Sequence, residues 1–179
     1  IYGCLVGSEM CIRDSNTSDG SVIGIDTTQP QITDITIYSN NSDNQTAKAG
    51  ENVFLTFTTS ESVRTPSKTD VTMSSLNNVS ISPLDSEGKL WKASGQVPSG
   101  SVGNVSFSIT VQDRAGNQGD SVTQTTDQSL VELDTEKPSL ENITLVSSNL
   151  HDSSFAKDGD KLKLRFNVYE SEVIQTPTV

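Results

Sequence analysis

The chain contains little of what catalytic and metal-binding proteins usually use. Its 179 residues include one histidine, one tryptophan and two cysteines, and aromatic residues make up 5% of them. No apolar run approaches the roughly 18 residues that a membrane-spanning helix requires. Lys and Arg number 12, against 23 Asp and Glu. Because nucleic-acid binding depends on basic residues that neutralise phosphates, we expect no nucleic-acid partner and no membrane insertion of this segment.

Both cysteines, Cys4 and Cys11, lie in a terminal stretch that we interpret as an artefact. Residues 5–15 read LVGSEMCIRDS, which is the translation of a transposase adapter used in sequencing libraries, and the preceding adapter bases account for Ile1 and Cys4. We therefore expect residues 1–15 to be a translated adapter with no fold, and the chain to be a fragment from a metagenomic assembly. Such a segment carries no information about export.

Removing residues 1–15 leaves no cysteine, so the sequence offers no disulfide, thiol nucleophile or thiolate metal site. Without Glu9, Asp14 and Arg13 the remainder has 21 acidic and 11 basic residues, a net charge of −10. An acidic surface suits solubility, saline surroundings or divalent cations. The remainder is rich in Ser, Thr, Asn, Asp and Val, which favours short strands joined by polar turns over long helices.

The sequence repeats itself with an offset of 108 residues. Residues 19–30, DGSVIGIDTTQP, align with residues 127–138, DQSLVELDTEKP, so that Asp26 and Asp134 are equivalent. After a shift of one residue, AKAGE at 47–51 aligns with AKDGD at 156–160, and the alternating apolar residues that follow also align. Two inserted residues then bring Ser60-Glu61 onto Ser171-Glu172. Chance similarity between two polar segments would not preserve apolar phase, proline and glycine together, so we infer a tandem repeat.

This alignment predicts the domain boundaries. Residues 16–26 are expected to be the last strand and linker of a preceding repeat, residues 27–134 a complete domain, and residues 135–179 the truncated start of the next repeat. Half a domain lacks the opposing sheet that its apolar face needs. We therefore expect the apolar residues between 162 and 166 to remain partly exposed.

Apolar residues with a period of two predict an all-β fold. Strands are expected at 32–37, 53–57 and 105–111, of which the last is the most regular, and shorter ones at 71–73, 79–81, 90–93 and 129–133. Turn-forming residues separate these segments. About seven short strands in roughly 100 residues predict an antiparallel β-sandwich of two sheets, with a barrel as the alternative.

Three motifs resemble a known family. They are DTTQP at 26–30, VFLTFTTSE at 53–61 followed by Thr65-Pro66, and the segment 107–117, which ends in DRAGN. Together they are similar to the bacterial immunoglobulin-like (Ig-like) repeats of large surface proteins and adhesins. A long polar stretch at 66–90 departs from the family pattern. The resemblance implies an Ig-like sandwich at the cell surface or outside the cell, neighbouring repeats of the same chain as partners, and a role as a stalk, spacer or adhesin module without catalysis.

The residues themselves also indicate a protein that is not an enzyme. His151 lies in an expected polar loop, and no catalytic or cofactor-binding constellation accompanies it. No host-cell or glycan ligand can be identified from the sequence. The alternative function is an accessory sandwich of a secreted polysaccharide-active enzyme, in which Trp91 stacks on a sugar. Its neighbours Leu90 and Ala93 favour a core position for Trp91 instead.

Calcium is the one cofactor that the sequence suggests. Asp26 and Asp134 directly precede Thr-x-x-Pro in successive linkers, and the turn after the penultimate strand could bring Asp113, Asn117 and Asp120 towards Asp134. Carboxylate, amide and backbone oxygens are the ligands that calcium takes. The resemblance implies that such junctions stiffen an array. Two alternatives remain open: Asp113 and Asn117 cap their own turn, or Asp26 and Asp134 are solvated linker charges.

Overall fold

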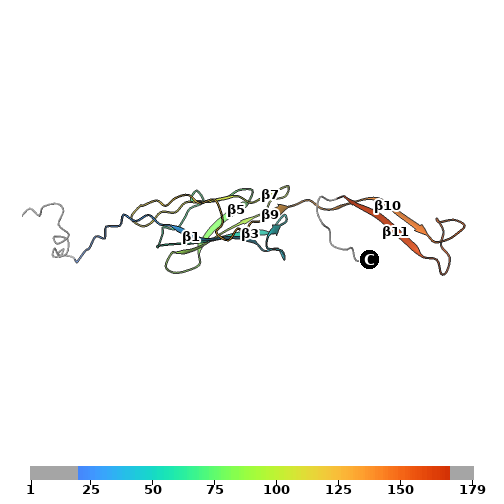
Figure 1. Ribbon diagram of the computed structural model, residues 1–179, viewed down its shortest axis with the longest axis horizontal. Helices are drawn as coiled ribbons and strands as arrows, with labels where there is room; N and C mark the ends of the chain where they lie inside the picture. The colour runs from blue at the N-terminus through green and yellow to red at the C-terminus, as the bar shows by residue number, and fades with distance from the viewer. Residues whose placement is uncertain (1–19, 170–179) are drawn as a thin grey trace, which may run out of the picture.

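The computed structural model describes residues 20–169. Within that range the chain is all-β, with strands β1 to β11 and no helix, as the period-two pattern predicts. Accordingly, the described residues include no helical segment suited to crossing a membrane. The strands form a sandwich near the middle of the molecule and a separate hairpin beyond its C-terminal end (Figure 1).

The first layer of the sandwich is an antiparallel sheet with the order β1-β3-β6-β5. Its strands are β1 (Ile32–Ser39), β3 (Asn52–Thr59), β6 (Leu90–Gln96) and β5 (Asn77–Pro83). The second layer is made of shorter pieces: β2 (Thr46–Ala47), β9 (Glu132–Asp134), β7 (Val102–Asn104), β4 (Val71–Met73) and β8 (Phe107–Ile109). All pairs are antiparallel except β2 with β9, which run parallel.

Alternating residues of these strands fill the space between the layers. In β3, Val53, Leu55 and Phe57 are completely buried, while the residues between them are half-buried. Ile109 of β8 and the other apolar residues of the second layer close the opposite side of the same cluster. Full burial of one such side chain stabilises the fold by roughly 1.5–3 kcal/mol. Since each layer covers the apolar face of the other, this stabilisation requires both layers.

Two predicted strands are shorter than expected. Only Phe107–Ile109 of the predicted strand 105–111, and only Glu132–Asp134 of the region around 129–133, form ladders. The first segment changes partner along its length: Val105 N–H donates to Val131 O at 2.9 Å, whereas Ile109 and Val122 exchange bonds of 2.9 Å. Every second residue from Val105 to Val111 is nevertheless buried. The period of two thus predicted correctly which side chains are buried, although the ladder is interrupted.

The separate hairpin consists of β10 (Ser139–Ser147) and β11 (Leu162–Tyr169). Leu162 and Leu164 are 65% and 50% exposed, and Phe166 is half-buried. This agrees with the expectation that the apolar face of this segment remains partly uncovered.

The two hairpins share their pairing register. Ser39 of β1 lies opposite Val53 of β3, and Ser147 of β10 lies opposite Leu162 of β11. The offsets between these pairs are the 108 and 109 residues of the sequence alignment. Both ladders also carry an irregularity near the start of their first strand.

The turns that close the two hairpins match as well. The Lys48 N–H donates to Glu51 Oε2 at 3.0 Å, and the Lys157 N–H donates to Asp160 Oδ2 at 2.9 Å. The glycine inside each turn has a φ of 86°, a left-handed conformation that favours glycine. Matching turn chemistry therefore accompanies matching sequence.

Residues 20–31 precede the sandwich and form no strand. Val22, Ile23 and Ile25 are 93%, 89% and 78% exposed. A strand in this segment would need a sheet to join, so its assignment to a preceding repeat stays a prediction. The expected artefact at 1–15 and residues 170–179, which include Glu172, lie outside the described residues.

Candidate metal centre at the entry to the sandwich

The turn after β8 is built around the Asp113 side chain. Asp113 Oδ1 accepts hydrogen bonds from Gly116 N–H at 2.6 Å and from Asn117 N–H at 2.8 Å. Asp113 Oδ2 accepts from Asn117 Nδ2 at 2.7 Å. Gly116 has a φ of 102°, which allows the backbone to turn this sharply. Asp113 is therefore buried in its own turn, and the turn-capping interpretation of the sequence holds.

This turn also holds the linker that enters the sandwich. Asn117 Nδ2 donates to the carbonyl oxygen of Asp26 at 3.0 Å. Farther along, Pro30 is buried, and a Cβ atom at position 119 would collide with the Pro30 carbonyl oxygen. Gly119 thus permits the close passage of the linker over the turn.

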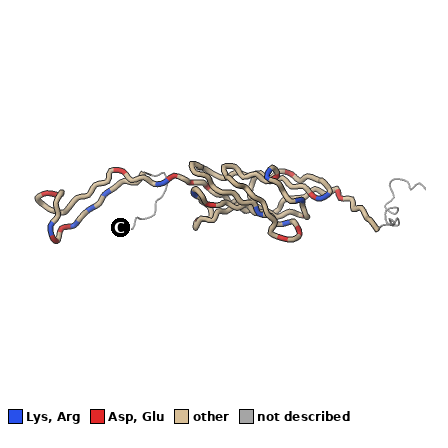
Figure 2. Tube along the Cα trace, turned by 180° about the vertical axis from the view of Figure 1, so that it is seen from behind, with Lys and Arg blue, Asp and Glu red and all other residues tan. Residues whose placement is uncertain are grey.

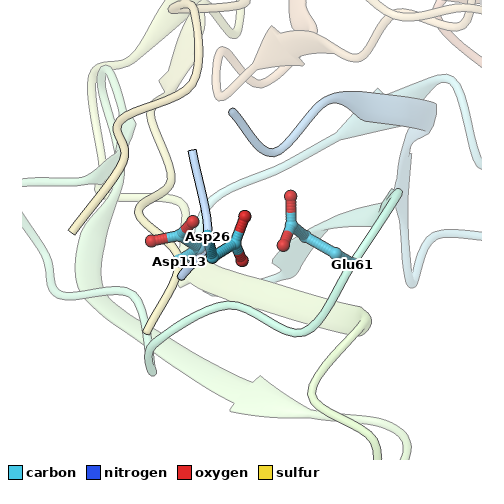
Figure 3. Close-up of side chains that lie close together, drawn as sticks. All are labelled: Asp26, Glu61 and Asp113. Atoms are coloured by element: carbon cyan, nitrogen blue, oxygen red, sulfur yellow. The ribbon is translucent and has the colours of Figure 1, made fainter. Parts of the chain in front are cut away.

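Three carboxylates meet at this point, one from each of three segments. Asp26 comes from the linker, Glu61 from the loop after β3 and Asp113 from the turn after β8. One oxygen of each lies within 4.8 Å of the others. Figure 3 shows the Glu61 side chain reaching across towards Asp26 and Asp113. Neither ion pair among the described residues involves these three groups.

The electrostatics of the cluster differ between its members. Partial desolvation, followed by the negative charges of Asp26 and Asp113, raises the pKa of Glu61. Burial of Asp113 also disfavours its charge, but the hydrogen bonds from Asn117 and Gly116 outweigh that effect and lower the pKa of Asp113. Asp113 is thus held as a carboxylate by its turn, whereas Glu61 faces negative charges that the positive charge of Lys89 only partly offsets.

The expectation about which aspartate meets the turn is wrong. Asp134 ends β9 opposite Val102, at the exit of the sandwich, whereas the Asp113 turn lies at the entry with Asp26. Figure 2 shows acidic residues on both linkers, at opposite ends of the sandwich. The chain between Val102 and Asp113 runs along the sandwich, so one turn cannot contact both linkers. Asp120 is exposed and lies outside the cluster.

The two linker aspartates nevertheless share a local conformation. Asp26 Oδ1 accepts from Thr28 N–H at 3.0 Å, and Asp134 Oδ1 accepts from Glu136 N–H at 3.1 Å. In both cases the side chain bonds the backbone two residues on, which is the usual behaviour of Asp at a turn. What distinguishes Asp26 is therefore its surroundings.

Glu61 is the member of the cluster that sequence reasoning did not assign. Its signal was the Ser60-Glu61 pair, which recurs in the sequence as Ser171-Glu172. The loop is anchored to the linker by two bonds: Gln31 N–H donates to Ser60 Oγ at 2.9 Å, and Ser60 N–H donates to the Gln31 carbonyl oxygen at 2.8 Å. The serine thus positions the loop that carries the glutamate.

The donor set fits calcium. Three carboxylates with oxygens close together provide hard ligands, and the Glu61 carboxylate has no hydrogen-bond donor among the described residues. A bound divalent cation would offset the negative charges of Asp26 and Asp113, which add to desolvation in raising the Glu61 pKa. It would also join the linker to two loops of the sandwich.

The other residues that the sequence singled out lie elsewhere. Trp91 is 2% exposed, and its Nε1 donates to the Gly88 carbonyl oxygen at 3.1 Å. It belongs to the core, so its ring has no free face for a sugar and the stacking role is wrong. His151 is exposed in the turn between β10 and β11, as expected for a loop residue.

Comparisons with known proteins add little to this picture. No protein-family model and no curated protein sequence matches the chain. A solved structure described as "GspB Siglec domain" is similar, with 17% identity and a TM-score of 0.38, over 69% of this chain and 66% of that one. The chain thus spans just under two thirds of that structure. We transfer no ligand, partner or residue role from it.

Proposed function

We propose that the chain is a segment of a tandem array of Ig-like repeats, which acts as a stalk, spacer or adhesin module on the outside of a bacterial cell. The matching register and turns of the β1–β3 and β10–β11 hairpins carry this proposal. Residues 27–134 form one complete repeat, and residues from 135 onward begin the next. Such modules act through length and stiffness and have no enzymatic activity.

The partners of a repeat in this arrangement are its neighbours in the chain. An Asp-Thr-x-x-Pro linker leads into each repeat. In the complete repeat, the turn at residues 113–119 holds this linker in a defined path. A fixed path sets the direction from which the previous repeat arrives. The reach of the array then grows with the number of copies.

Calcium is the proposed cofactor of this junction. Asp26, Glu61 and Asp113 supply carboxylate oxygens, and Asn117 orients Asp113 and the linker through its side chain. Extracellular modules bind calcium with dissociation constants of roughly 10⁻⁴ to 10⁻³ M. At the calcium concentrations outside a cell, the ion would stiffen the linker without any permanent crosslink.

Isothermal titration of the whole chain with calcium chloride tests this site. We expect one site per chain with a dissociation constant of about 10⁻⁴ to 10⁻³ M. Asp26→Asn removes one carboxylate from the cluster and should weaken binding about tenfold or more. Asp134→Asn is the matched control, because it changes the equivalent residue of the other linker and preserves the cluster.

Two results would reject the calcium site. One is the absence of binding heat at millimolar calcium, and the other is equal weakening by Asp26→Asn and Asp134→Asn. The array itself is tested separately by recovering the complete reading frame. Further copies with a period near 108 residues support a stalk, and a neighbouring catalytic domain would instead favour an accessory module of a polysaccharide-active enzyme.

A further inference from the structure

A groove runs along the side of the sandwich between residues 104–107 and residues 123–130. Its volume is about 490 Å³, within the range of roughly 300–1,000 Å³ typical of small-molecule sites. It lies away from the carboxylate cluster, with which it shares no residue. The core residues Ile37, Val105 and Phe107 line it, together with Leu130, which is 48% exposed.

The groove exists because the second layer opens at this point. Val122 pairs with Ile109, and Val131 accepts a bond from Val105, but the residues between 122 and 131 leave the sheet. They attach to β1 instead: Ile35 N–H donates to Thr126 Oγ1 and Ile37 N–H donates to Ser129 Oγ, both at 2.9 Å. The result is a gap beside β8 that has a defined wall on each side.

The open edge of β8 presents unsatisfied peptide groups to this gap. Ser74 N–H donates to Ser106 O and Thr110 N–H donates to Asp70 O, so the alternation of an antiparallel ladder directs the Phe107 peptide groups away from β4. No hydrogen bond joins Phe107 to the wall at 123–130 among the described residues. One N–H and one C=O group therefore remain for a ligand, too few for the addition of an extended strand.

The polar side chains around the groove are all uncharged. Although 20% of the chain is charged, the lining contains no Asp, Glu, Lys or Arg. Its rim carries the exposed amides of Asn104, Gln124 and Gln128 and the hydroxyls of Ser106 and Thr123, none of which bonds another side chain or backbone group among the described residues. Amides and hydroxyls both donate and accept hydrogen bonds, which matches a ligand with several hydroxyl groups.

The wall that carries two of these residues is held in a fixed conformation. Gln128 has a φ of 62°, in the left-handed region. Ser129 N–H donates to Asp127 Oδ1 at 3.0 Å, and Thr125 Oγ1 donates to the Ser129 carbonyl oxygen at 2.8 Å. A turn fixed in this way lowers the entropy cost of presenting Gln128 to a ligand.

We propose that this groove binds a neutral saccharide, whose hydroxyls bond the rim amides and the Phe107 peptide groups while its apolar face rests on Leu130. The absence of charged residues argues against acidic sugars, which would require basic partners. This inference goes beyond the spacer role and does not depend on it. It also places sugar binding at a site remote from the buried Trp91.

An array of immobilised glycans tests the proposal, using the whole chain and pairs of neutral and sialylated glycans with the same core. We expect binding to neutral members, weakened at least tenfold by the double substitution Gln124→Ala and Gln128→Ala. Gln45→Ala is the matched control, because Gln45 is exposed on the same sandwich, lies outside the groove and makes no side-chain hydrogen bond. Amide chemical-shift changes should centre on Phe107 and residues 123–130.

Unfolding temperatures of the variants, measured alongside, should equal that of the unsubstituted chain because the substituted side chains are exposed. The proposal is overturned if no neutral glycan binds at millimolar concentration, if only the sialylated members bind, or if the double variant binds as well as the control. Shift changes confined to another face would also overturn it. None of these results bears on the calcium titration or on the repeat count.

Discussion

The β1–β3 and β10–β11 hairpins have the same register and the same turn hydrogen bonds, but they differ in burial. Leu55 of β3 is completely buried, whereas Leu164 of β11, at the equivalent position, is 50% exposed. The first hairpin continues into β6 and is covered by a second layer. Local sequence is thus sufficient to define a hairpin, whereas its stability requires the strands that follow in the chain.

Two contributions to stability are usually mixed in a folded domain: the pairing and turn of each hairpin, and the contacts with further strands and a closed core. The two hairpins allow these contributions to be separated. Turn chemistry and strand pairing are common to both hairpins, so they cannot account for a difference in stability between them. An isolated two-stranded hairpin is marginally stable at best in water. Any difference in protection therefore measures the contribution of the additional sheet contacts and the closed core.

Hydrogen exchange of equivalent amides should show the largest difference. Phe54 pairs with Tyr38 on β1, and Lys163 pairs with Val146 on β10. The protection factor of an amide is its exchange rate in an unfolded chain divided by its measured rate. We expect this factor to be at least about a thousandfold larger for Phe54 than for Lys163, because exchange at Phe54 requires unfolding of the sandwich. NMR-detected exchange measures both amides in one sample, and equal protection would contradict the comparison.

Truncation of equivalent leucines should show the next largest difference. Leu55→Ala leaves a cavity in a closed core and should lower the free energy of unfolding of the sandwich by about 2–5 kcal/mol. Leu164→Ala should change the same quantity by less than about 0.5 kcal/mol, since surface changes rarely do more. Urea denaturation followed by Trp91 fluorescence reports the sandwich in both variants. A comparable loss from Leu164→Ala would mean that the hairpin supports the sandwich.

The carboxylate cluster should give a smaller effect, confined to the entry of the sandwich. Because the pKa of Glu61 is raised in the folded protein, its charge destabilises the fold at neutral pH, and protonation relieves this as the pH falls through the folded pKa. Glu61→Gln should therefore raise the melting temperature slightly at pH 7 without calcium. The gain should vanish at low pH, and calcium should no longer stabilise the variant.

Asp113 should respond to pH with the opposite sign. Its pKa is lowered in the folded state, so its stabilising contribution is complete above the ordinary carboxyl range, near pH 4, and is lost as the pH falls through the folded value. Asp113→Asn should therefore flatten the acid limb of a plot of melting temperature against pH. Calorimetry between pH 2 and pH 7 measures the melting temperature across this range. An unchanged acid limb in the variant would contradict the role of the Asp113 carboxylate in stabilising its turn.

Much of the fold could be predicted from the sequence because burial imposes a period of two. The pattern located β3 around Val53, Leu55 and Phe57, and it located the short β4 at residues 71–73. It did not find β2 or β7, because two or three residues with one buried side chain or none carry no period. The opening of the sheet at 123–130 was also beyond the pattern, since it depends on side chains that bond a distant strand.

The site was predicted in part. Asp26, Asp113 and Asn117 do come together, whereas Asp134 and Asp120 do not join them. The error lay in the direction of the chain: sequence position shows that a turn precedes a linker, but only the topology shows at which end of the sandwich the turn lies. Glu61 joins the cluster through the folding of a third loop, which no local spacing encodes.

The attachment of residues 126 and 129 to β1 also affects how copies of the protein meet. β1 is the edge of its sheet, and an uncovered edge is a template on which a strand from another molecule can pair. The hydroxyls of Thr126 and Ser129 occupy two of its N–H groups, and the Thr126 N–H donates to the Ile35 carbonyl oxygen at 3.0 Å. A second copy of the protein that approaches this edge therefore finds these groups of β1 already bonded, which disfavours strand pairing between copies through β1.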